Sequence, residues 1–364
     1  MSTTTSFFPP TLLRGLLGAD WLRPLNDPVA LDDLLAMIRP TWSLTAIKAE
    51  VVGATGETGD VRTLLLRPNR LWPGHRAGQH VQVEVEIDGR RLRRTFSISS
   101  APRPDGLVAV TVKRREGGKV SRWWNDDARV GDVITLSAPA GEFVLPSLLP
   151  RRVVMLSAGS GITPLMAMLR DLDARGHGCE VLFVHCAHSH AEVIFRSELE
   201  EIARRRPWLE LRMHLAQTSG RLGEESLSRL AAEAADAPVF VCGPQGFMDA
   251  ARSAWRAAGR EQQLHFEWFG LPTRVAETGV PEPVRAERSG VTFVAEAGQS
   301  LLEAAEAAGL RPAHGCRIGV CHTCKCRKLS GVVEDLRDGR LSVESGEMIQ
   351  LCVSTARSAV TLEL

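Results

Sequence analysis

The sequence contains no tyrosine, although it has 11 phenylalanine and 8 tryptophan residues. It also lacks an apolar run long enough to cross a membrane. The amino terminus, MSTTTSFFPPTLLRG, has no basic start before an apolar core and no small-residue cleavage site, so we expect no secretory signal. These absences predict a cytoplasmic chain. Structural disulfides are rare in a reducing cytoplasm, so the eight cysteines indicate a metal or redox site.

Neither sign of charge is in excess, because 44 lysine and arginine residues offset 43 aspartate and glutamate residues. A net charge of +1 gives no general attraction to nucleic acid, and we expect no nucleic-acid partner. The length of 364 residues favours two or three domains.

The first half of the chain divides into an extension and a barrel. Residues 1–43 carry leucine-rich patches, TLLRGLL and ALDDLLAMI, which predict short helices. We expect this N-terminal helical extension to pack on the barrel, with an approach to a membrane as the alternative. Residues 44–148 contain the strand candidates HVQVEVEI, VAVTVK and DVITLSAP between Gly, Pro and Asp turns. This pattern predicts an antiparallel β-barrel.

Strands and helices alternate over residues 149–270, which predicts an α/β domain with a mostly parallel sheet. Thr163 is the expected N-cap of its first helix, with Pro164 in the first turn. Residues 271–288 are rich in Pro and charge and predict a linker. Residues 289–364 form a third unit, in which Ser300 and Glu303 make a capping box and Gly309 ends the helix.

Four cysteines lie within HGCRIGVCHTCKC. Cys316, Cys321 and Cys324 have the spacing C-x4-C-x2-C, and Cys352 follows later in the chain. This is the plant-type arrangement for four thiolates that hold a [2Fe–2S] cluster. Glycines beside the first two ligands let the loop wrap closely.

A zinc site is the alternative for these thiols. Four-thiolate zinc sites have two short cysteine pairs, and only Cys321 and Cys324 form such a pair here. The spacing therefore favours the iron–sulfur cluster. Cys326 is the remaining cysteine of the segment, and we expect it to be a buried packing residue.

Two resemblances to known families follow from these motifs. Residues 289–364 resemble the plant-type ferredoxin domain, a β-grasp fold, in GQSLLEAAEAAGL, HGCRIGVCHTC and the later LCVS. Residues 44–268 resemble the ferredoxin–NADP reductase superfamily, whose two domains bind flavin and nicotinamide. That resemblance is carried by RRTFSISS, TVKRREGGKVSRWW, SAGSGITP, CGP and HFEWFG.

The family's flavin signature is Arg-x-Tyr-Ser/Thr, and this chain has Arg94-Thr95-Phe96-Ser97. The resemblance implies that Arg94 binds the flavin phosphate, that Phe96 lies against the isoalloxazine and that Ser97 lies near flavin N5. Phenylalanine replaces the family's tyrosine, so one hydrogen bond of about 0.5–1.5 kcal/mol is lost and flavin binding should survive.

The second flavin motif includes Val112, Lys113, Gly118, Val120 and Ser121. The free N–H groups of a helix that opens at Gly118 suit a pyrophosphate. This stretch resembles the FAD-binding flavohaemoglobin-type reductases. The FMN-binding phthalate-dioxygenase reductases share the domain order but differ in sequence here, so we expect FAD.

The nicotinamide motifs are two short loops and the end of the domain. The first loop comprises Gly159, Ser160, Gly161, Thr163 and Pro164, and the second comprises Cys242, Gly243 and Pro244. Glycines let a dinucleotide pyrophosphate approach the backbone. The resemblance implies that Cys242 lies beside the nicotinamide and that Glu267 or Phe269 lies over the flavin.

The choice of nicotinamide depends on the second strand of this domain. AHSH follows CEVLFVHC, with no carboxylate to bind a ribose 2′-hydroxyl. Arg196 and Arg221 could bind a 2′-phosphate, or each could be a solvated surface charge. We expect NADPH.

The predicted function is an NAD(P)H-dependent reductase that passes electrons through FAD and a [2Fe–2S] cluster to an external acceptor. The domain order and the leader FFPP…RPTWSL resemble bacterial reductases that serve fatty-acyl desaturases or other oxygenases. The resemblance to desaturase reductases implies a membrane-bound acceptor and a reductase peripheral to the inner membrane. The alternatives are a reductase for a soluble ring hydroxylase and a non-catalytic electron-carrying subunit of a larger flavin dehydrogenase.

The segment around the cysteines is also basic. Arg317, Lys325, Arg327 and Lys328 predict a docking surface for an acidic patch on the acceptor, the alternative being a solvated loop.

Overall fold

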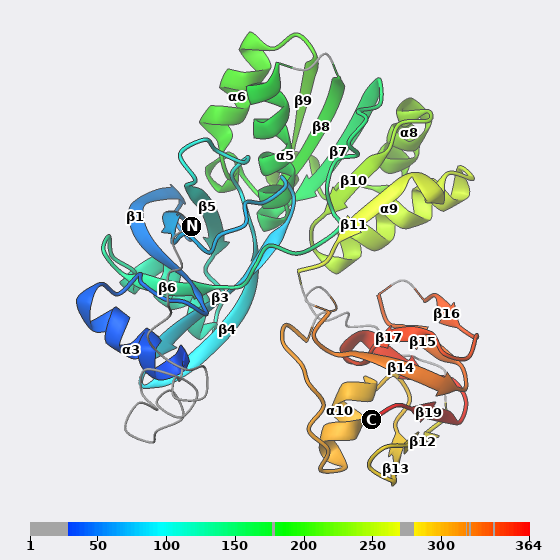
Figure 1. The fold of residues 1–364 in the computed structure, drawn as a ribbon. Coiled ribbons are helices and arrows are strands. Elements are labelled where there is room, and N and C mark those ends of the chain that lie inside the picture. Colours follow the sequence, from blue (N-terminus) through cyan, green and yellow to red (C-terminus); the bar gives the residue numbers. More distant parts are fainter. Residues whose placement is uncertain (1–27, 177–178, 270–279, 318, 320–321, 338) are drawn as a thin grey trace, which may run out of the picture.

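The computed structural model describes residues 28–176, 179–269, 280–317, 319, 322–337 and 339–364. Three domains follow one another along the chain (Figure 1). The predicted fold class is confirmed, with an antiparallel first sheet, a parallel second sheet and a mixed third sheet. No helix in these described ranges is long and apolar enough to cross a membrane.

The first domain is a six-stranded antiparallel sheet in the order β4-β3-β6-β1-β2-β5. Its strands are β1 (Ile47–Thr58), β2 (Val61–Pro68), β3 (His80–Ile87), β4 (Arg90–Ser97), β5 (Val108–Lys113) and β6 (Val133–Leu136). A bridge between Ile98 and Val110 joins the two outer strands, so the sheet closes into a barrel. Alternating residues of the strands fill its interior, as the two-residue period predicts.

Two helical segments accompany the barrel. Helix α3 (Pro28–Ile38) confirms the predicted ALDDLLAMI helix, whereas TLLRGLL lies outside the described residues. The Asp32 carboxylate of α3 accepts hydrogen bonds from Ser43 and from the backbone of Leu44, which holds the helix beside the start of β1. Between β5 and β6, α4 (Lys119–Arg122) continues into a π-helical turn (Trp123–Asp127).

The second domain is a parallel sheet in the order β11-β10-β7-β8-β9 with helices on both faces. Its strands are β7 (Arg152–Ala158), β8 (Glu180–Ala187), β9 (Leu209–Leu215), β10 (Val239–Cys242) and β11 (Leu264–Glu267). Its helices are α5 (Ile162–Arg175), α6 (Arg196–Arg205), α7 (Ala216–Ser219), α8 (Glu224–Ala234) and α9 (Gln245–Ala257).

One detail at the start of α5 differs from the sequence-based expectation. Gly161, not Thr163, is the N-cap, because a 3₁₀ turn over Gly159–Gly161 runs directly into the helix. Thr163 instead lies inside the first turn and donates a hydrogen bond to the Ser160 carbonyl over 3.1 Å. Pro164 is in the first turn, as predicted.

The third domain has a mixed sheet in the order β13-β12-β19-β14-β17 and a smaller sheet in the order β16-β15-β18. The strands of the larger sheet are β12 (Glu282–Ala286), β13 (Val291–Ala295), β14 (Lys325–Ser330), β17 (Met348–Gln350) and β19 (Val360–Leu362). Those of the smaller sheet are β15 (Val333–Asp335), β16 (Leu341–Ser342) and β18 (Ser354–Ala356). Helix α10 (Leu301–Ala307) packs on them, and Ser300 caps it by accepting a hydrogen bond from Glu303 N–H, as predicted.

Strand β12 lies within residues 271–288, which the composition predicts to be a linker. It pairs with β13 and β19, and its burial alternates along the strand. The end of the predicted linker is therefore the first strand of the third domain. Two residues that suggested a linker, Pro283 and Arg285, occupy the exposed face of β12.

The first two domains meet through apolar and polar contacts, and the Phe143 ring centroid of the first domain lies 5.5 Å from that of Phe240 in β10. The Arg170 guanidinium of α5 donates to the Ser99 carbonyl of the barrel. Lys113 Nζ lies 3.3 Å from Asp60 in its own domain and 3.8 Å from Glu192 in the second domain. These contacts fix the orientation of the parallel sheet relative to the barrel.

Candidate functional site

The predicted flavin signature lies on the outer strand β4. Arg94 is exposed and donates to the Arg93 carbonyl over 2.6 Å, so its guanidinium is at the surface. Phe96 is half-buried, with its ring centroid 5.7 Å from that of Trp124 in the π-helical turn. The two flavin motifs are therefore adjacent in space.

Two hydroxyl groups lie on the other face of β4, those of Thr95 and Ser97. Thr95 Oγ1 and Ser97 Oγ are buried and make no hydrogen bond within the described residues. A buried hydroxyl without a partner is costly, so its presence indicates a ligand or water at that position. Ser97, which the family resemblance places near flavin N5, is thus available to bind one.

His80 is a site residue that the sequence did not reveal. It is the register partner of Ser97 across β3 and β4, so the two side chains lie on the same face. Its ring is 3% exposed, and its Nδ1 lies 3.5 Å from Glu267 Oε1 of the second domain. The sequence offered one signal for this role, a histidine at the start of a strand with alternating apolar residues. Its partner Glu267 is distant in sequence, so the contact itself could not be predicted.

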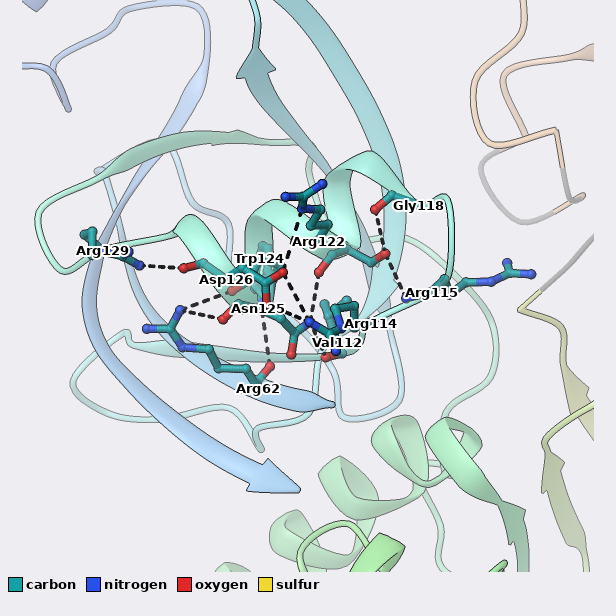
Figure 2. Close-up of polar contacts among 11 residues, drawn as sticks. Arg62, Val112, Arg114, Arg115, Gly118, Arg122, Trp124, Asn125, Asp126 and Arg129 are labelled. Atoms are coloured by element: carbon teal, nitrogen blue, oxygen red, sulfur yellow. Dashed lines mark hydrogen bonds and ion pairs between the residues drawn. The ribbon is translucent and has the colours of Figure 1, made fainter. Parts of the chain in front are cut away.

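Hydrogen bonds from two side chains connect α4 and the π-helical turn to the barrel strands (Figure 2). Asn125 Nδ2 donates to the carbonyls of Val112 and Ser121, which ties β5 to α4. Arg62 donates to the carbonyls of Trp124, Asn125 and Ala128, where carbonyl groups lack helical partners. Val112 and Val120 are buried in the barrel core beneath this turn.

Gly118 opens α4 with no space for a side chain. An added Cβ would lie 2.5 Å from Ser121 Oγ and 3.2 Å from Arg115 Cβ. The Ser121 hydroxyl accepts a hydrogen bond from Arg115 N–H and donates one to the Gly118 carbonyl, so it shapes the turn. Its role in binding a pyrophosphate stays a prediction.

A cavity of about 620 Å³ lies at this end of α4. The lining residues are Asp60, Arg114, Arg115, Glu116, Gly117, Gly118, Lys119, Arg122 and Asp126. Asp126 lies 3.2 Å from Arg114 and 3.9 Å from Arg122. Within the described part of the chain, Arg115 and Lys119 have no acidic partner, so the cavity retains cations for an anionic ligand.

The nicotinamide loop follows β7. Gly159 has a φ of +54°, which favours glycine. Gly161 is close to the second predicted loop, because an added Cβ would lie 2.2 Å from the Cys242 carbonyl oxygen. Gly243 is similarly tight against Ala158, at 3.0 Å. The structure therefore brings the two sequence motifs together at one edge of the sheet.

Strand register places three side chains in a row at this edge. Cys242 is paired with Ser157 of β7 on one side and with Glu267 of β11 on the other. Burial, reinforced by the nearby Glu267, raises the pKa of the Cys242 thiol well above its usual value. Cys242 is therefore a neutral thiol at physiological pH and not a thiolate nucleophile.

The structure connects three of the four residues predicted to act at the reaction centre, and the fourth packs elsewhere. Ser97, Cys242 and Glu267 are connected through His80 and the strand register. Phe269 is half-buried and packs against the core of the second domain. Its predicted position over the flavin stays a prediction.

Both candidate phosphate-binding arginines follow the carboxyl ends of strands. Arg196 begins α6, after β8, and lies 4.0 Å from Glu200. Arg221 follows β9 and the short α7 and is exposed. In a parallel sheet this edge binds the ligand. Their contact with a 2′-phosphate stays a prediction.

Three of the four predicted cluster ligands are in the described residues, whereas Cys321 lies outside them. The sulfur atoms of Cys324 and Cys352 are 3.2 Å apart, and both thiols are buried. Cys316 and Cys324 both hydrogen-bond with Cys352, which raises the pKa of that thiol. Hydrogen bonding with Cys352 lowers the pKa of Cys324 to about 7. The described residues alone include no group of three ligands arranged around a metal ion.

Cys326 has the predicted packing role. It is buried in the core of the third domain, and burial raises its pKa to about 11. Gly319, between the first two ligands, has a φ of +79°, and an added Cβ would lie 2.6 Å from Arg337 and 2.9 Å from Val353. A thiol-only donor set on a glycine-containing loop fits an iron–sulfur cluster.

The prediction that Lys328 belongs to a basic docking surface is wrong. Its side chain is 0% exposed, and its ammonium donates to the carbonyls of Gly331 and Ser342. Arg317 pairs with Glu306 over 2.6 Å, and Arg327 lies 3.6 Å from Glu363. Lys325 is exposed. Side chains of β14 alternate between the two faces of the strand, and Lys328 is on the buried face. The run of basic residues in the sequence did not reveal this burial.

The geometry fits the cofactors that the motifs predict. The unpartnered hydroxyls of Thr95 and Ser97 and the tight Gly118 turn fit a flavin and its pyrophosphate. The two nicotinamide loops pack closely at Gly161 and Cys242 only because Gly161 has no Cβ. The convergent thiols fit the iron–sulfur cluster.

Comparisons with known families agree with each domain. Residues 49–145 match the oxidoreductase FAD-binding domain, and residues 155–253 match the oxidoreductase NAD-binding domain. Residues 284–357 match the 2Fe-2S iron-sulfur cluster binding domain. The chain is therefore an oxidoreductase with FAD-binding, NAD(P)-binding and [2Fe–2S] domains.

Relatives match over most of their lengths. NADPH oxidoreductase of Mycobacterium tuberculosis (strain ATCC 25618 / H37Rv) is 34% identical over 93% of this chain and 90% of that protein. The ferredoxin reductase component of 3-ketosteroid-9-alpha-monooxygenase from M. tuberculosis (strain CDC 1551 / Oshkosh) is 33% identical over 79% and 86%. The structure of phthalate dioxygenase reductase is similar, with a TM-score of 0.60 and 27% identity over 88% and 98%. The chain therefore belongs to the ferredoxin–NADP reductase family of flavoproteins that carry a C-terminal [2Fe–2S] ferredoxin domain.

Proposed function

We propose that this protein is the reductase component of an oxygenase system and that NADPH is its preferred electron donor. The single observation that carries the proposal is the meeting of two domains at one buried point. His80 of the barrel contacts Glu267, which neighbours Cys242 at the ligand edge of the parallel sheet. A donor bound at that edge is then adjacent to the flavin motif.

The bound cofactors would accept a hydride as an electron pair at the flavin and release single electrons through the iron–sulfur cluster. The protein residues position and shield these groups. The neutral Cys242 thiol would pack beside the nicotinamide without reacting with it. Ser97 would donate a hydrogen bond to the flavin, and Glu267 would place a polar group beside the reacting rings.

The preference for NADPH rests on the charges at the sheet edge. No carboxylate follows β8 in the sequence AHSH, whereas Arg196 and Arg221 follow β8 and β9. A guanidinium can bind a phosphate through two parallel hydrogen bonds. The name of the M. tuberculosis relative, an NADPH oxidoreductase, supports the same choice.

The acceptor is proposed from the relatives. Two of them are named as the reductase of a monooxygenase and of a dioxygenase, which supports an oxygenase as the acceptor. A membrane-bound fatty-acyl desaturase is the second candidate. The exposed apolar side chains of α3, including Met37 at 83% exposure and Ile38, support a position near a membrane.

Two measurements test this function. Steady-state kcat/KM should be higher for NADPH than for NADH, and the difference should shrink in Arg196→Ala or Arg221→Ala. The protein should also retain an oxygenase or desaturase from extracts of its native cell. A clear preference for NADH would contradict the choice of donor, and failure to reduce any such retained protein would contradict the choice of acceptor.

A further inference from the structure

Arg252 of α9 connects the second domain to the third. The residue is 7% exposed, and its guanidinium carbon lies 4.7 Å from the Phe266 ring centroid and 5.4 Å from that of Trp268. Arg252 also donates to the Arg337 carbonyl of the third domain over 3.1 Å. A guanidinium held against two aromatic rings has little rotational freedom, so this hydrogen bond has a fixed direction.

Arg337 is in turn attached to the loop that carries the predicted cluster ligands. Its guanidinium donates to the Gly319 carbonyl over 2.9 Å, between Cys316 and Cys321 in sequence. Asp335 and Gln350 hold the same guanidinium at 2.6 Å and 3.0 Å. A continuous series of contacts therefore runs from β11, which ends at Glu267, through Arg252 to the cluster loop.

The third domain lies on the side of α9 and β11 (Figure 1). The Arg252–Arg337 contact joins it there to the second domain, and the Arg337–Gly319 contact extends from that junction to the segment that carries the ligands.

We propose that Arg252 is a positioning residue. It holds the ferredoxin domain against the nicotinamide domain and so sets the rate of electron transfer between flavin and cluster. This inference rests on the proposed function, because it assumes that electrons move from the flavin to the cluster. Electron transfer slows steeply as the distance between flavin and cluster increases. If the ferredoxin domain separates from the nicotinamide domain for part of the time, the average rate of transfer falls.

The chain provides a matched control one helical turn away. Arg256 lies on the same helix and makes two hydrogen bonds of 2.7 Å with Glu261, to which Arg252 is also close at 3.8 Å. Arg256 is 61% exposed, and its described contacts are within the second domain. Arg252→Met keeps an unbranched stem between the aromatic rings and removes the donor, whereas Arg256→Met makes the same change away from the interface.

The test uses the full-length holoprotein. Arg252→Met should keep its NADPH–ferricyanide activity within about twofold of wild type, since that dye takes electrons from the flavin. Stopped-flow reduction of the cluster should be about three- to tenfold slower, because the lost hydrogen bond comes from a charged donor. Arg252→Lys should recover part of this rate, and Arg256→Met should match wild type.

Hydrogen exchange gives a readout that does not depend on electron transfer. Backbone amides around Leu336 and Arg337 should exchange faster in Arg252→Met than in Arg256→Met. Equal exchange and equal cluster reduction in these two variants would overturn the inference, as would an Arg252→Lys variant as slow as Arg252→Met. If the wild-type flavin is reduced by NADPH but the cluster never is, the proposed function itself fails, whatever Arg252 does.

Discussion

Glu267 and His80 come from different domains, and their side chains meet in the interior, with Glu267 Oε1 3.5 Å from His80 Nδ1. Both side chains are nearly inaccessible to water. His80 is also the strand partner of Ser97, and Glu267 is the strand partner of Cys242. This one contact therefore joins the predicted flavin residues to the predicted nicotinamide residues.

Glu267→Gln should slow the reduction of the flavin by NADPH. The amide keeps the shape of the carboxyl group but changes its electrostatics beside the transferring hydride, and a preorganised polar group of this kind contributes roughly 10²–10³-fold to a rate. We expect a fall of at least about tenfold in single-turnover flavin reduction, with FAD content unchanged. Glu261→Gln on the surface should have no effect. A Glu267→Gln rate equal to wild type would remove this role from Glu267.

Gly161→Ala should damage the nicotinamide domain. The added Cβ would lie 2.2 Å from the Cys242 carbonyl oxygen, so the backbone of one loop must move. Overpacking of this kind costs about 1–3 kcal/mol. The free energy of unfolding should fall by that amount and the KM for NADPH should rise. Gly246→Ala meets no atom within 4 Å and serves as the control. Equal stability of the two variants would contradict the close packing.

Much of the fold was predictable because local patterns determine it. HVQVEVEI forms β3, since a two-residue alternation fits a strand with one buried face. VAVTVK forms β5, a short run of β-branched residues that is buried on both faces. The Ser300 cap was predictable for the same reason, because it involves only residues three apart.

The rest depends on contacts between residues that are distant in sequence. The role of His80 requires Glu267, which belongs to another domain. The burial of Lys328 requires carbonyl acceptors at Gly331 and Ser342. Strand β12 has a composition typical of a linker, and only its pairing with β13 and β19 makes it a strand.

His185 should make the stability of the protein dependent on acid. Burial lowers its pKa to about 4 from an ordinary 6.5, and its Nδ1 lies 2.8 Å from Ser157 Oγ. Below about pH 6.5 the unfolded chain binds a proton on His185, whereas the folded protein keeps this ring neutral down to about pH 4. The contribution of neutral His185 to the free energy of unfolding is therefore complete above pH 6.5 and is lost as the pH falls. Between pH 7.5 and pH 5 the loss should be about 2 kcal/mol.

Urea unfolding of wild type and His185→Gln at both pH values checks this expectation. Comparison of the two proteins removes the effect of other titrating groups, provided that they are unchanged by the substitution. The wild type should lose about 2 kcal/mol more than the variant on acidification. The same loss in both proteins would show that His185 is not the group responsible.

The central claim is that electrons reach the external acceptor only by way of the flavin and then the cluster, and anaerobic stopped-flow reduction by NADPH tests it most directly. Flavin absorbance should change first and cluster absorbance second in wild type and in Cys326→Ser, whose substituted thiol packs in the core. Cys324→Ala removes a predicted ligand, so it should keep the flavin phase and ferricyanide activity and lose both the cluster phase and reduction of the acceptor protein. Cluster reduction before the flavin, or an acceptor still reduced by Cys324→Ala, would contradict the account.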